Sequence, residues 1–237
     1  MPRFFVPEIQ SEEIRIIGED ARHMAKSLRL LVGDEITLCD GKGWDYQGKV
    51  QELGDEVIIR IVSKQETRSE PRAKVTLFQA LPKGDKMELI IQKCVELGVH
   101  EIVPVLTSRC ISRPDEKSMR KKVERYNKIA LEAAKQSGRG IIPRVSELLT
   151  LEQAVKRLSE KNIVFYENGG QRLHELVSEK TLDLGVFVGS EGGFSMEEII
   201  FLEQHQVFPA TLGERILRCE TAPICGLSVI FCLTGDI

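Results

Sequence analysis

The 237-residue chain has no long hydrophobic run, no Cys-x-x-Cys pair and no cluster of histidines. Without an apolar stretch of about 20 residues, the sequence offers no membrane-spanning helix. Its first residues, Met-Pro-Arg-Phe-Phe-Val-Pro-Glu, lack the apolar core of a signal peptide. The six cysteines are scattered at positions 39, 94, 110, 219, 225 and 232, and the four histidines are equally dispersed. The sequence therefore predicts a cytoplasmic protein with free thiols and no metal site.

The chain also lacks an excess of charge of one sign. Its 33 Lys and Arg are offset by 36 Asp and Glu, for a net charge of −3. This balance argues against a protein that holds nucleic acid by bulk positive charge. The exception is the segment 109–144, which contains 11 basic and 4 acidic residues. A solvated helix face would explain such a run, but in a chain that is acidic elsewhere the excess favours an RNA-facing stripe.

Short strand patterns fill the first 65 or so residues, separated by turn signals such as Asp40-Gly-Lys-Gly43. The predicted strands are 4–6, 14–17, 35–39, 46–53 and 56–63, and one helix is expected at about 19–30. These elements predict a small β-barrel. The polar stretch 64–72, which contains Pro71, is the expected linker, so the predicted domains are 1–69 and 73–237.

From residue 73 onward, strand-like and helix-like patterns alternate, which is typical of an α/β domain with a mainly parallel sheet. The predicted strands are 75–80, 102–106, 163–166, 184–188 and 208–212. The main predicted helices are 85–97, 116–137 and 221–233. The last of these is apolar over most of its circumference, so it is expected to be buried on more than one side.

Two late segments are the most informative features of the chain: Gly189-Ser-Glu-Gly-Gly-Phe-Ser195 and Leu212-Gly-Glu-Arg-Ile-Leu-Arg-Cys-Glu-Thr-Ala222. Each follows a predicted buried strand and opens a helix, so both should lie at the carboxyl ends of strands, where open α/β sheets bind ligands. Neither segment contains the Gly-Lys-Ser/Thr of a Walker A loop. The strand 75–80 leads into Leu81-Pro-Lys-Gly-Asp-Lys86, whose single glycine does not make a dinucleotide fingerprint.

At these segments the chain resembles the RsmE-type 16S ribosomal RNA uridine N3-methyltransferases of the knotted SPOUT superfamily. That family has a Gly-Pro-Glu-Gly-Gly-Phe loop and a Leu-Gly-x-Arg-Ile-Leu-Arg-Thr-Glu-Thr-Ala segment. Further similar segments are Lys83-Gly-Asp-Lys-Met-Glu88, Gln92-Lys-Cys-Val-Glu-Leu-Gly98, Ala133-Ala-Lys-Gln-Ser-Gly-Arg139 and the amino-terminal His23, Leu28-Arg-Leu30, Gly33-Asp34 and Asp40-Gly41. Ser190 in place of proline and Cys219 in place of threonine are the departures.

The resemblance implies a SPOUT-type α/β knot methyltransferase domain, with a carboxyl-terminal trefoil knot, and an amino-terminal PUA-like β-barrel that binds RNA. It implies S-adenosylmethionine as cofactor, N3 of a uridine in 16S ribosomal RNA of the small subunit as the methyl acceptor, and a homodimer formed through the helix 221–233. Neither a metal nor a membrane partner is expected.

The candidate site residues follow from the two late segments and the family likeness. The expected cofactor-binding residues are Phe165, Glu167, Asn168, Gly189, Glu191, Gly192, Gly193, Leu212, Gly213, Ile216, Leu217, Thr221 and Ala222. Arg218 is the leading catalytic candidate, because a guanidinium near the uracil carbonyls would stabilise the charge left when N3 loses its proton. Glu220 is the second catalytic candidate, and it either orients Arg218 or favours a helix start. The expected RNA-binding residues are Arg3, Arg22, His23, Arg29, Lys83, Lys86, Arg109, Lys135 and Arg139.

Three other functions remain open at this point. An RNA-binding module without catalysis would not need two ligand-binding corners. A phosphate-binding α/β transferase would bind a nucleoside triphosphate at the Gly189 loop. A related methyltransferase acting on another RNA base differs only in its target, which residues alone do not fix.

Overall fold

The computed structural model describes residues 2–7 and 9–237, and the chain forms two compact units. Unit 1 comprises the described residues up to Glu70 together with Ala134–Ile142, and unit 2 comprises Pro71–Ala133 and Pro143–Ile237. The sequence analysis assigns residues 134–142 to the second domain, whereas the structure groups them with unit 1. Within that unit the thiol of Cys39 donates to the carbonyl oxygen of Gly140 at 3.2 Å, and Ser69 Oγ donates to that of Gly138 at 2.6 Å.

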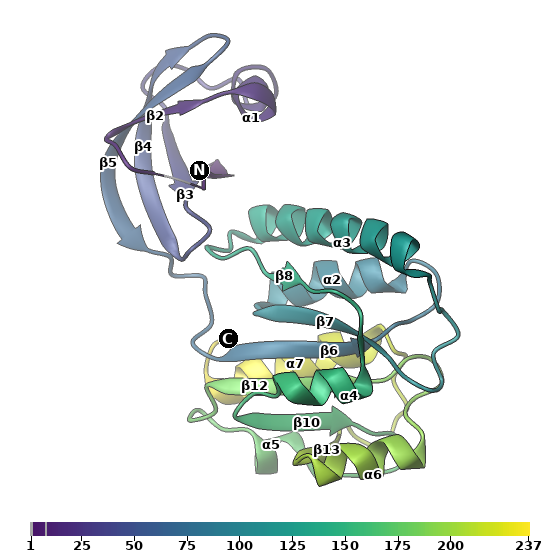
Figure 1. Ribbon diagram of the computed structural model, residues 1–237. Coiled ribbons are helices and arrows are strands. Elements are labelled where there is room, and N and C mark those ends of the chain that lie inside the picture. The colour runs from purple at the N-terminus through teal and green to yellow at the C-terminus, as the bar shows by residue number, and fades with distance from the viewer. Residues whose placement is uncertain (1, 8) are drawn as a thin grey trace. The chain divides into compact units, whose positions relative to one another are not determined.

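Unit 1 contains a five-stranded sheet in the order β1-β3-β4-β5-β2, with one parallel pair, β1 and β3, and antiparallel pairs elsewhere (Figure 1). Its strands are β1 (Arg3–Phe5), β2 (Glu13–Ile16), β3 (Glu35–Cys39), β4 (Trp44–Leu53) and β5 (Val57–Glu66). Alternating side chains enter one core, as in β2, where Ile14 and Ile16 are buried and Glu13 and Arg15 are exposed. All five strands were predicted to within a few residues.

The helix predicted at 19–30 is shorter and less regular than expected. The α-helix α1 (Gly18–Arg22) continues into a π-helix, η1 (His23–Ser27), and Ala21 and Met24 from these two turns are buried in the unit 1 core. Arg29 adopts a φ of 52°, which is left-handed backbone. Right-handed helical geometry therefore ends before residue 30.

Unit 2 is built on an eight-stranded sheet in which every pair is parallel, as predicted. The strand order is β11-β13-β10-β12-β6-β7-β8, with β9 also paired to β7. The strands are β6 (Lys74–Ala80), β7 (Glu101–Leu106), β8 (Arg144–Val145), β9 (Leu149–Thr150), β10 (Lys161–Phe165), β11 (Gln171–Arg172), β12 (Asp183–Val188) and β13 (Val207–Thr211). The three two-residue strands escaped prediction because they are too short to carry a period.

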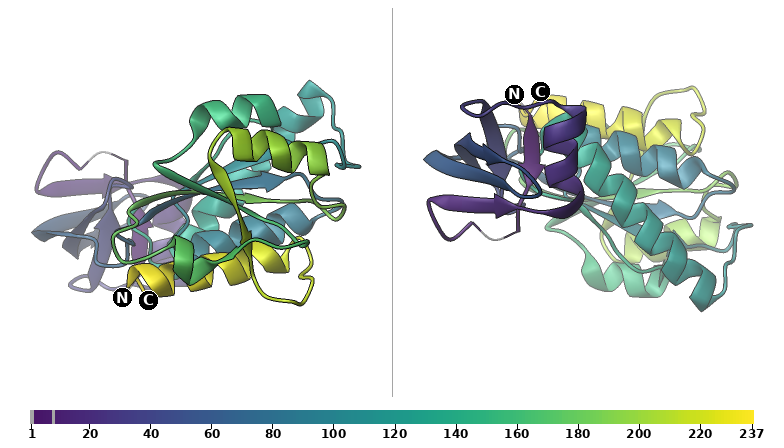
Figure 2. Two further views of the ribbon diagram at one scale, coloured as in Figure 1. Left: turned by 90° about the horizontal axis from the view of Figure 1, so that it is seen from below. Right: turned by 90° about the horizontal axis from the view of Figure 1, so that it is seen from above.

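Helices cover both faces of this sheet (Figure 2). They are α2 (Lys86–Leu97), α3 (Glu116–Ser137), α4 (Leu151–Ala154) with the 3-10 turn η2 (Val155–Arg157), α5 (Leu173–Leu176), α6 (Met196–Gln204) and α7 (Thr221–Thr234). α4 and α6 pack on one face, against a core that includes Phe78, Val164 and Phe187. α2 and α7 pack together on the other face. With both faces covered, a central strand such as β12 is almost entirely buried.

The end of α7 is anchored at the start of the sheet. Gly235 ends the helix in a left-handed conformation, and the carboxylate of Asp236 accepts hydrogen bonds from Arg72 N at 2.8 Å and Thr234 Oγ1 at 2.8 Å. Burial opposes the charged form of Asp236, but the Arg72 N–H and the other donors lower its pKa. This anchor fixes the helix that follows the second glycine-containing segment. Threading of the chain into a knot stays a prediction.

Among the residues that the structure describes, no helix combines the length and the apolar character that a membrane crossing requires.

Candidate functional site

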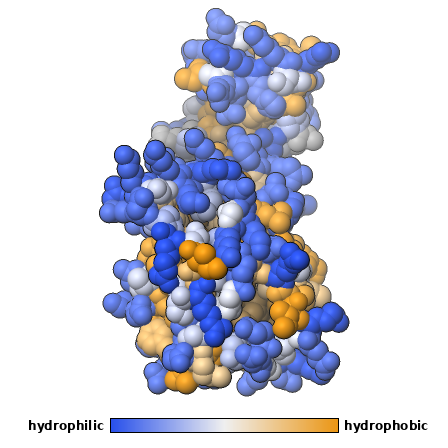
Figure 3. All heavy atoms as spheres, turned by 90° about the vertical axis from the view of Figure 1, so that its right-hand side faces the viewer, coloured by the Kyte–Doolittle hydropathy of each residue, from blue (hydrophilic) through white to orange (hydrophobic). Residues whose placement is uncertain are grey.

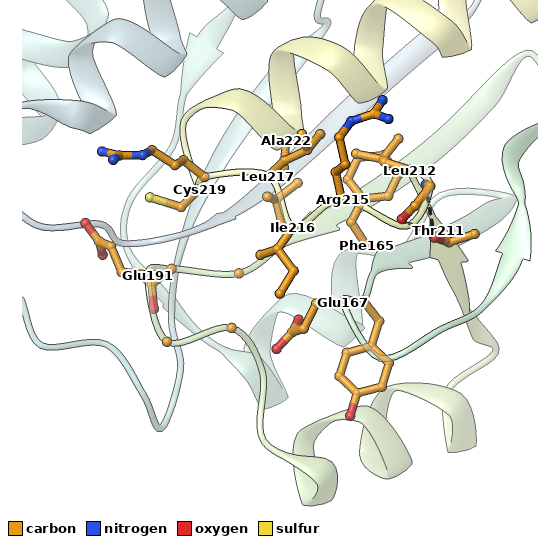
Figure 4. Close-up of a pocket in the computed structure, with 18 of the residues that line it drawn as sticks. Phe165, Glu167, Glu191, Thr211, Leu212, Arg215, Ile216, Leu217, Cys219 and Ala222 are labelled. Carbon is orange, nitrogen blue, oxygen red and sulfur yellow. Dashed lines mark hydrogen bonds between the residues drawn. The ribbon is translucent and has the colours of Figure 1, made fainter.

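A pocket of roughly 470 Å³ lies at the carboxyl ends of three adjacent strands of unit 2, β12, β10 and β13 (Figure 4). Parallel strands end at one edge, so the loops that follow them meet there. The pocket is lined by Lys86, Phe165, Tyr166, Glu167, Val188, Gly189, Ser190, Glu191, Gly192, Gly193, Thr211, Leu212, Gly213, Glu214, Arg215, Ile216, Leu217, Arg218, Cys219 and Ala222. Figure 3 views the side toward which the strands of unit 2 end, and the surface of unit 2 in this view is mainly hydrophilic with separate apolar groups.

The loop after β12 requires its glycines for close packing. Gly193 has a φ of +64°, and a Cβ there would lie 2.5 Å from Glu167 Oε1. A Cβ on Gly192 would lie 3.0 Å from Arg109 Cβ. The loop closes through a 3.0 Å bond from Gly193 N to the Ser190 carbonyl oxygen, and the buried Gln79 Nε2 donates to the carbonyl oxygen of Gly189 at 3.2 Å. A side chain at 193 would therefore be strained by the positive φ and would displace the Glu167 carboxylate of the pocket, whereas one at 192 would press against Arg109.

The loop after β13 presents apolar side chains beside its backbone. Gly213 turns the chain with a φ of +105°, and its N–H donates to Thr211 Oγ1 at 3.1 Å (Figure 4). Ile216 is 82% exposed and points toward Glu167 at the end of β10. The carbonyl oxygen of Arg218 then accepts hydrogen bonds from the N–H groups of Thr221 and Ala222, which begins α7. An apolar side chain this exposed in a pocket wall favours a ligand with a flat apolar surface.

A charged cluster closes one end of the pocket. Lys86 Nζ lies 2.9 Å from Glu191 Oε1, 3.3 Å from Glu220 Oε2 and 3.8 Å from Cys219 Sγ. The hydrogen bond with Glu191 is the main reason that the pKa of Lys86 is raised. Burial opposes ionisation of both carboxylates, but the contact with Lys86 lowers the pKa of Glu191, and the contacts with Cys219 and Lys86 lower the pKa of Glu220. Burial raises the pKa of the Cys219 thiol to about 12, so this thiol is neutral at physiological pH.

Most of the predicted cofactor-binding residues come together in this pocket. Exceptions are Asn168, whose Nδ2 donates to the Tyr166 hydroxyl at 3.1 Å, and Thr221, which starts α7. Of the two catalytic candidates, Arg218 lines the pocket, and its side chain is exposed. Glu220 does not line it but contacts it through Lys86.

The predicted RNA-binding residues lie in several places. Arg22, His23 and Arg29 are exposed in unit 1, and Lys83 is exposed in unit 2. Lys135 is half-buried with its Nζ 4.0 Å from Asp20 Oδ1, and Lys86 belongs to the charged cluster of the pocket. Arg109 is exposed, and its Nη1 donates to the Gly192 carbonyl oxygen at 2.9 Å.

Two of the RNA-binding predictions are corrected by the structure. Arg139 is only 2% exposed, and its guanidinium makes two 2.8 Å bonds to the Glu70 carboxylate. Arg3 donates two hydrogen bonds to the carboxylate of Asp45, and its side chain is largely buried. Both arginines are therefore committed to ion pairs inside unit 1. The local sequence around a basic residue does not predict whether the fold will bring an acidic residue from elsewhere in the chain into an ion pair with it.

Seven pocket residues are not among the expected cofactor-binding residues: Tyr166, Val188, Ser190, Thr211, Glu214, Arg215 and Cys219. Tyr166, Ser190, Glu214, Arg215 and Cys219 lie in the three loops beside expected residues, and Val188 and Thr211 are the last residues of β12 and β13. The sequence predicts an RNA contact for Lys86. Its actual position beside the pocket results from the pairing of β6 with β12, and this strand order cannot be predicted from the sequence.

The pocket fits the S-adenosylmethionine that the resemblance implies. Backbone groups of the glycine loops are suited to a polar purine edge, and Leu212, Ile216 and Leu217 to its faces. Ser190 Oγ is buried and has no hydrogen-bond partner within the described residues, so a bound ligand would satisfy it. Among those same residues, no three His, Cys, Asp or Glu side chains are grouped in a way that would hold a metal ion.

Comparison with known proteins gives concordant results. Residues 68–231 match the family described as RNA methyltransferase domain, and residues 16–62 match the RNA methyltransferase PUA domain. The chain is 35% identical to ribosomal RNA small subunit methyltransferase E of Bacillus subtilis, over 97% of this chain and 96% of the relative. The crystal structure of ribosomal RNA small subunit methyltransferase E from Neisseria gonorrhoeae, bound to S-adenosyl methionine, matches with a TM-score of 0.89 at 30% identity, covering 98% of both chains. A methyltransferase from Legionella pneumophila in complex with the same cofactor matches with a TM-score of 0.85 at 31% identity, over 97% of this chain and 96% of that one.

Proposed function

Because the chain belongs to the ribosomal RNA small subunit methyltransferase E family, we propose that it methylates N3 of one specific uridine in 16S ribosomal RNA, uridine 1498 in the numbering used for this family. It is an S-adenosylmethionine-dependent ribosomal RNA methyltransferase with a SPOUT-type α/β unit and a PUA-like unit. We propose that it acts in the cytoplasm, where its ribosomal RNA substrate is found. The observation that carries the proposal is the single pocket in which the loops after β10, β12 and β13 meet.

Each wall of the pocket has a role in this proposal. The backbone of 189–193 and 212–217 binds the adenine edge, and Leu212, Ile216 and Leu217 enclose the ring. Glu167 offers a carboxylate to hydroxyl or ammonium groups at the end of β10. The bound cofactor supplies an electrophilic methyl group. The task of the chain is to align the acceptor nitrogen with that methyl group and to exclude water, since alignment alone lowers a barrier by several kcal/mol.

Arg218 acts on the acceptor base. The N3 proton of uridine must leave before or during transfer, and negative charge then develops on the two flanking carbonyl oxygens. The exposed guanidinium of Arg218 lines the pocket and can stabilise that charge by donating hydrogen bonds to one of these oxygens, which leaves N3 open to the methyl group. Glu220 is held by Lys86 and by the Cys219 thiol, which donates to Glu220 Oε2 at 3.2 Å. We therefore propose that Glu220 fixes the conformation of the loop that carries Arg218.

Mass mapping of 16S ribosomal RNA tests this function. Cells that lack the protein should lose one methyl group from one uridine, and the purified protein with S-adenosylmethionine should restore it on isolated small subunits. Restoration of a methyl group at another base would leave the methyltransferase assignment intact and replace the target. Binding of RNA without any transfer would support the non-catalytic alternative.

The exposed face of α3 is the proposed RNA-binding stripe of unit 2. Lys117, Lys121 and Lys128 are exposed and lie at helical spacings of four and seven, hence on one side of the helix. Neighbouring cations are already paired, Arg120 with Glu116 and Arg125 with Glu88. The three lysines replace Arg139 and Lys135 as the groups expected to meet phosphates.

Replacing Lys117, Lys121 and Lys128 together by Gln should weaken RNA binding and lower the slope of log K against log salt by about 1 for each lost phosphate contact. Filter binding across a salt series measures this. A control with Lys74, Lys156 and Lys180 changed to Gln removes the same charge from exposed positions elsewhere in unit 2. Equal slopes for the two triple variants would contradict the stripe.

We also propose a homodimer through α7. One side of this helix, including Leu227, Ile230 and Phe231, is buried in unit 2. Val229, at 38% exposure, and the exposed Cys232 continue the apolar character on another side, as expected for a self-complementary patch at a two-fold axis. Val229→Glu should give a monomer in sedimentation, whereas Ile200→Glu, at an exposed position of α6, should leave the dimer intact. A monomeric parent protein would refute this interface.

A further inference from the structure

The segment from the end of β6 to the first residue of α2 holds the loop after β12 at several points. Lys83 N donates to the carboxylate of Glu191 at 3.2 and 3.3 Å, and Lys86 Nζ binds the same carboxylate at 2.9 Å. Gln79 Nε2, at the end of β6, donates to the Gly189 carbonyl oxygen. The strand β6 pairs directly with β12, so this segment is the nearest rigid support for the loop.

Lys86 also reaches the loop after β13. Its Nζ lies 3.3 Å from Glu220 Oε2, and the Cys219 thiol next to it donates to the same carboxylate oxygen. Glu220 is the residue that immediately precedes α7. One ammonium group therefore joins the two glycine-containing loops that form opposite sides of the pocket, and Figure 4 shows Glu191 and Cys219 close together at this end.

We propose that Lys86 is a positioning residue of the cofactor pocket, which holds Glu191 and Glu220 together and thereby keeps the loops after β12 and β13 at the separation that the methyl donor requires. This inference rests on the proposed function of the pocket. It assigns Lys86 to the geometry of the cofactor site in place of the RNA contact that the sequence suggested.

The electrostatics of the cluster give this role a distinct signature. Without the ammonium group, two carboxylates would face each other without a shared counter-ion, and like charges at short range raise the pKa of one of them. The repulsion between the loops would then increase as the pH rises and both carboxylates ionise. The other titratable group in contact, the Cys219 thiol, stays neutral because burial raises its pKa to about 12. The other charged residues next to these groups are Arg218, whose side chain is exposed, and Lys83, which contributes its backbone N–H.

The test measures binding of S-adenosylhomocysteine by calorimetry between about pH 5 and pH 8, where carboxylates with raised pKa values titrate. This probe lacks the sulfonium charge, so a loss of the lysine charge does not change a direct attraction to the methyl donor. The parent protein is expected to bind with nearly constant affinity. Lys86→Met should bind roughly two- to fivefold more weakly at pH 8, an effect in the range of partly exposed paired charges, and should approach the parent as the pH falls.

Two further variants isolate the cause. Lys86→Arg keeps the positive charge and should restore most of the affinity. Lys86→Met combined with Glu220→Gln removes the repulsion and should abolish the pH dependence. In Lys86→Met without ligand, amide hydrogen exchange in 189–194 and 212–220 should be faster than in the parent at the same pH, while cooperative unfolding is retained.

Parent-like affinity of Lys86→Met at every pH would overturn the proposal, and so would a loss that is equal at every pH and unaffected by Glu220→Gln. Failure of the parent protein to bind the probe at all would instead overturn the proposed function of the pocket.

Discussion

Arg218→Ala is expected to reduce methyl transfer by about 10²- to 10³-fold, the range seen when one group that stabilises a developing oxyanion is removed. The side chain of Arg218 is exposed, whereas its backbone carbonyl makes the bonds that begin α7. Truncation to Ala therefore removes the guanidinium and keeps the start of the helix. Transfer to isolated small ribosomal subunits, measured with labelled S-adenosylmethionine, reports the effect.

The affinity for the methyl donor and the oligomeric state should both be retained, because the guanidinium acts on the uracil. Arg218→Lys should recover only part of the rate, since an ammonium group lacks the planar pair of donors. Lys180→Ala, which removes an exposed cation elsewhere in unit 2, is the matched control for charge. Normal transfer by Arg218→Ala would remove this residue from the catalytic role.

The two glycine-containing segments were readable from the sequence because each combines a strand pattern, glycines and a helix start within a few residues. Their meeting in one pocket follows from the parallel sheet, which alternating strands and helices also predict. The strand order was not available, because it depends on pairings between distant segments, such as Lys74 of β6 with Asp183 of β12, which are 109 residues apart. Lys86 therefore looked like a surface cation, although β6 lies beside β12 and brings it to Glu191.

Local sequence patterns did not predict the structure correctly where contacts with residues far away in the sequence decide which side chains are buried. The helix predicted at 19–30 contains the right apolar positions, Ala21 and Met24, yet the backbone around them changes to a π-helix that no periodicity reveals. The sequence does show that the segment 109–144 has an excess of basic residues. This excess does not indicate which of them are exposed: Lys117 is exposed, whereas Arg139 is buried against Glu70, 69 residues earlier in the chain.

Glu70→Gln is expected to destabilise unit 1 by about 3 kcal/mol, the scale for removing one partner of a buried ion pair. The Glu70 carboxylate binds Arg139 through two hydrogen bonds and accepts two more, from Gly140 N at 2.7 Å and Ile141 N at 3.1 Å. These bonds join residues 139–141 to the end of the strand-rich segment. In the variant the buried guanidinium of Arg139 would lose the negative charge of the carboxylate that accepts two of its hydrogen bonds. The only tryptophan, Trp44, lies in β4, so its fluorescence during urea unfolding reports unit 1.

Two measurements distinguish loss of the ion pair from loss of packing: the pH dependence of the destabilisation by Glu70→Gln, and its size when Arg139 is replaced as well. Burial opposes the ionised form of Glu70, but Arg139 and the two backbone N–H groups lower its pKa below the unfolded value of about 4.3. Its contribution is therefore complete above that value and is lost as the pH falls through the folded pKa, so the parent and Glu70→Gln should converge in acid. Glu70→Leu combined with Arg139→Met should cost less than Glu70→Gln alone, because the double variant removes both charges of the pair from the interior. Glu66→Gln, at an exposed position of β5, controls for loss of a surface carboxylate. A Glu70→Gln protein whose Trp44 transition matches that of the Glu66→Gln control would show that Arg139 does not depend on this pairing.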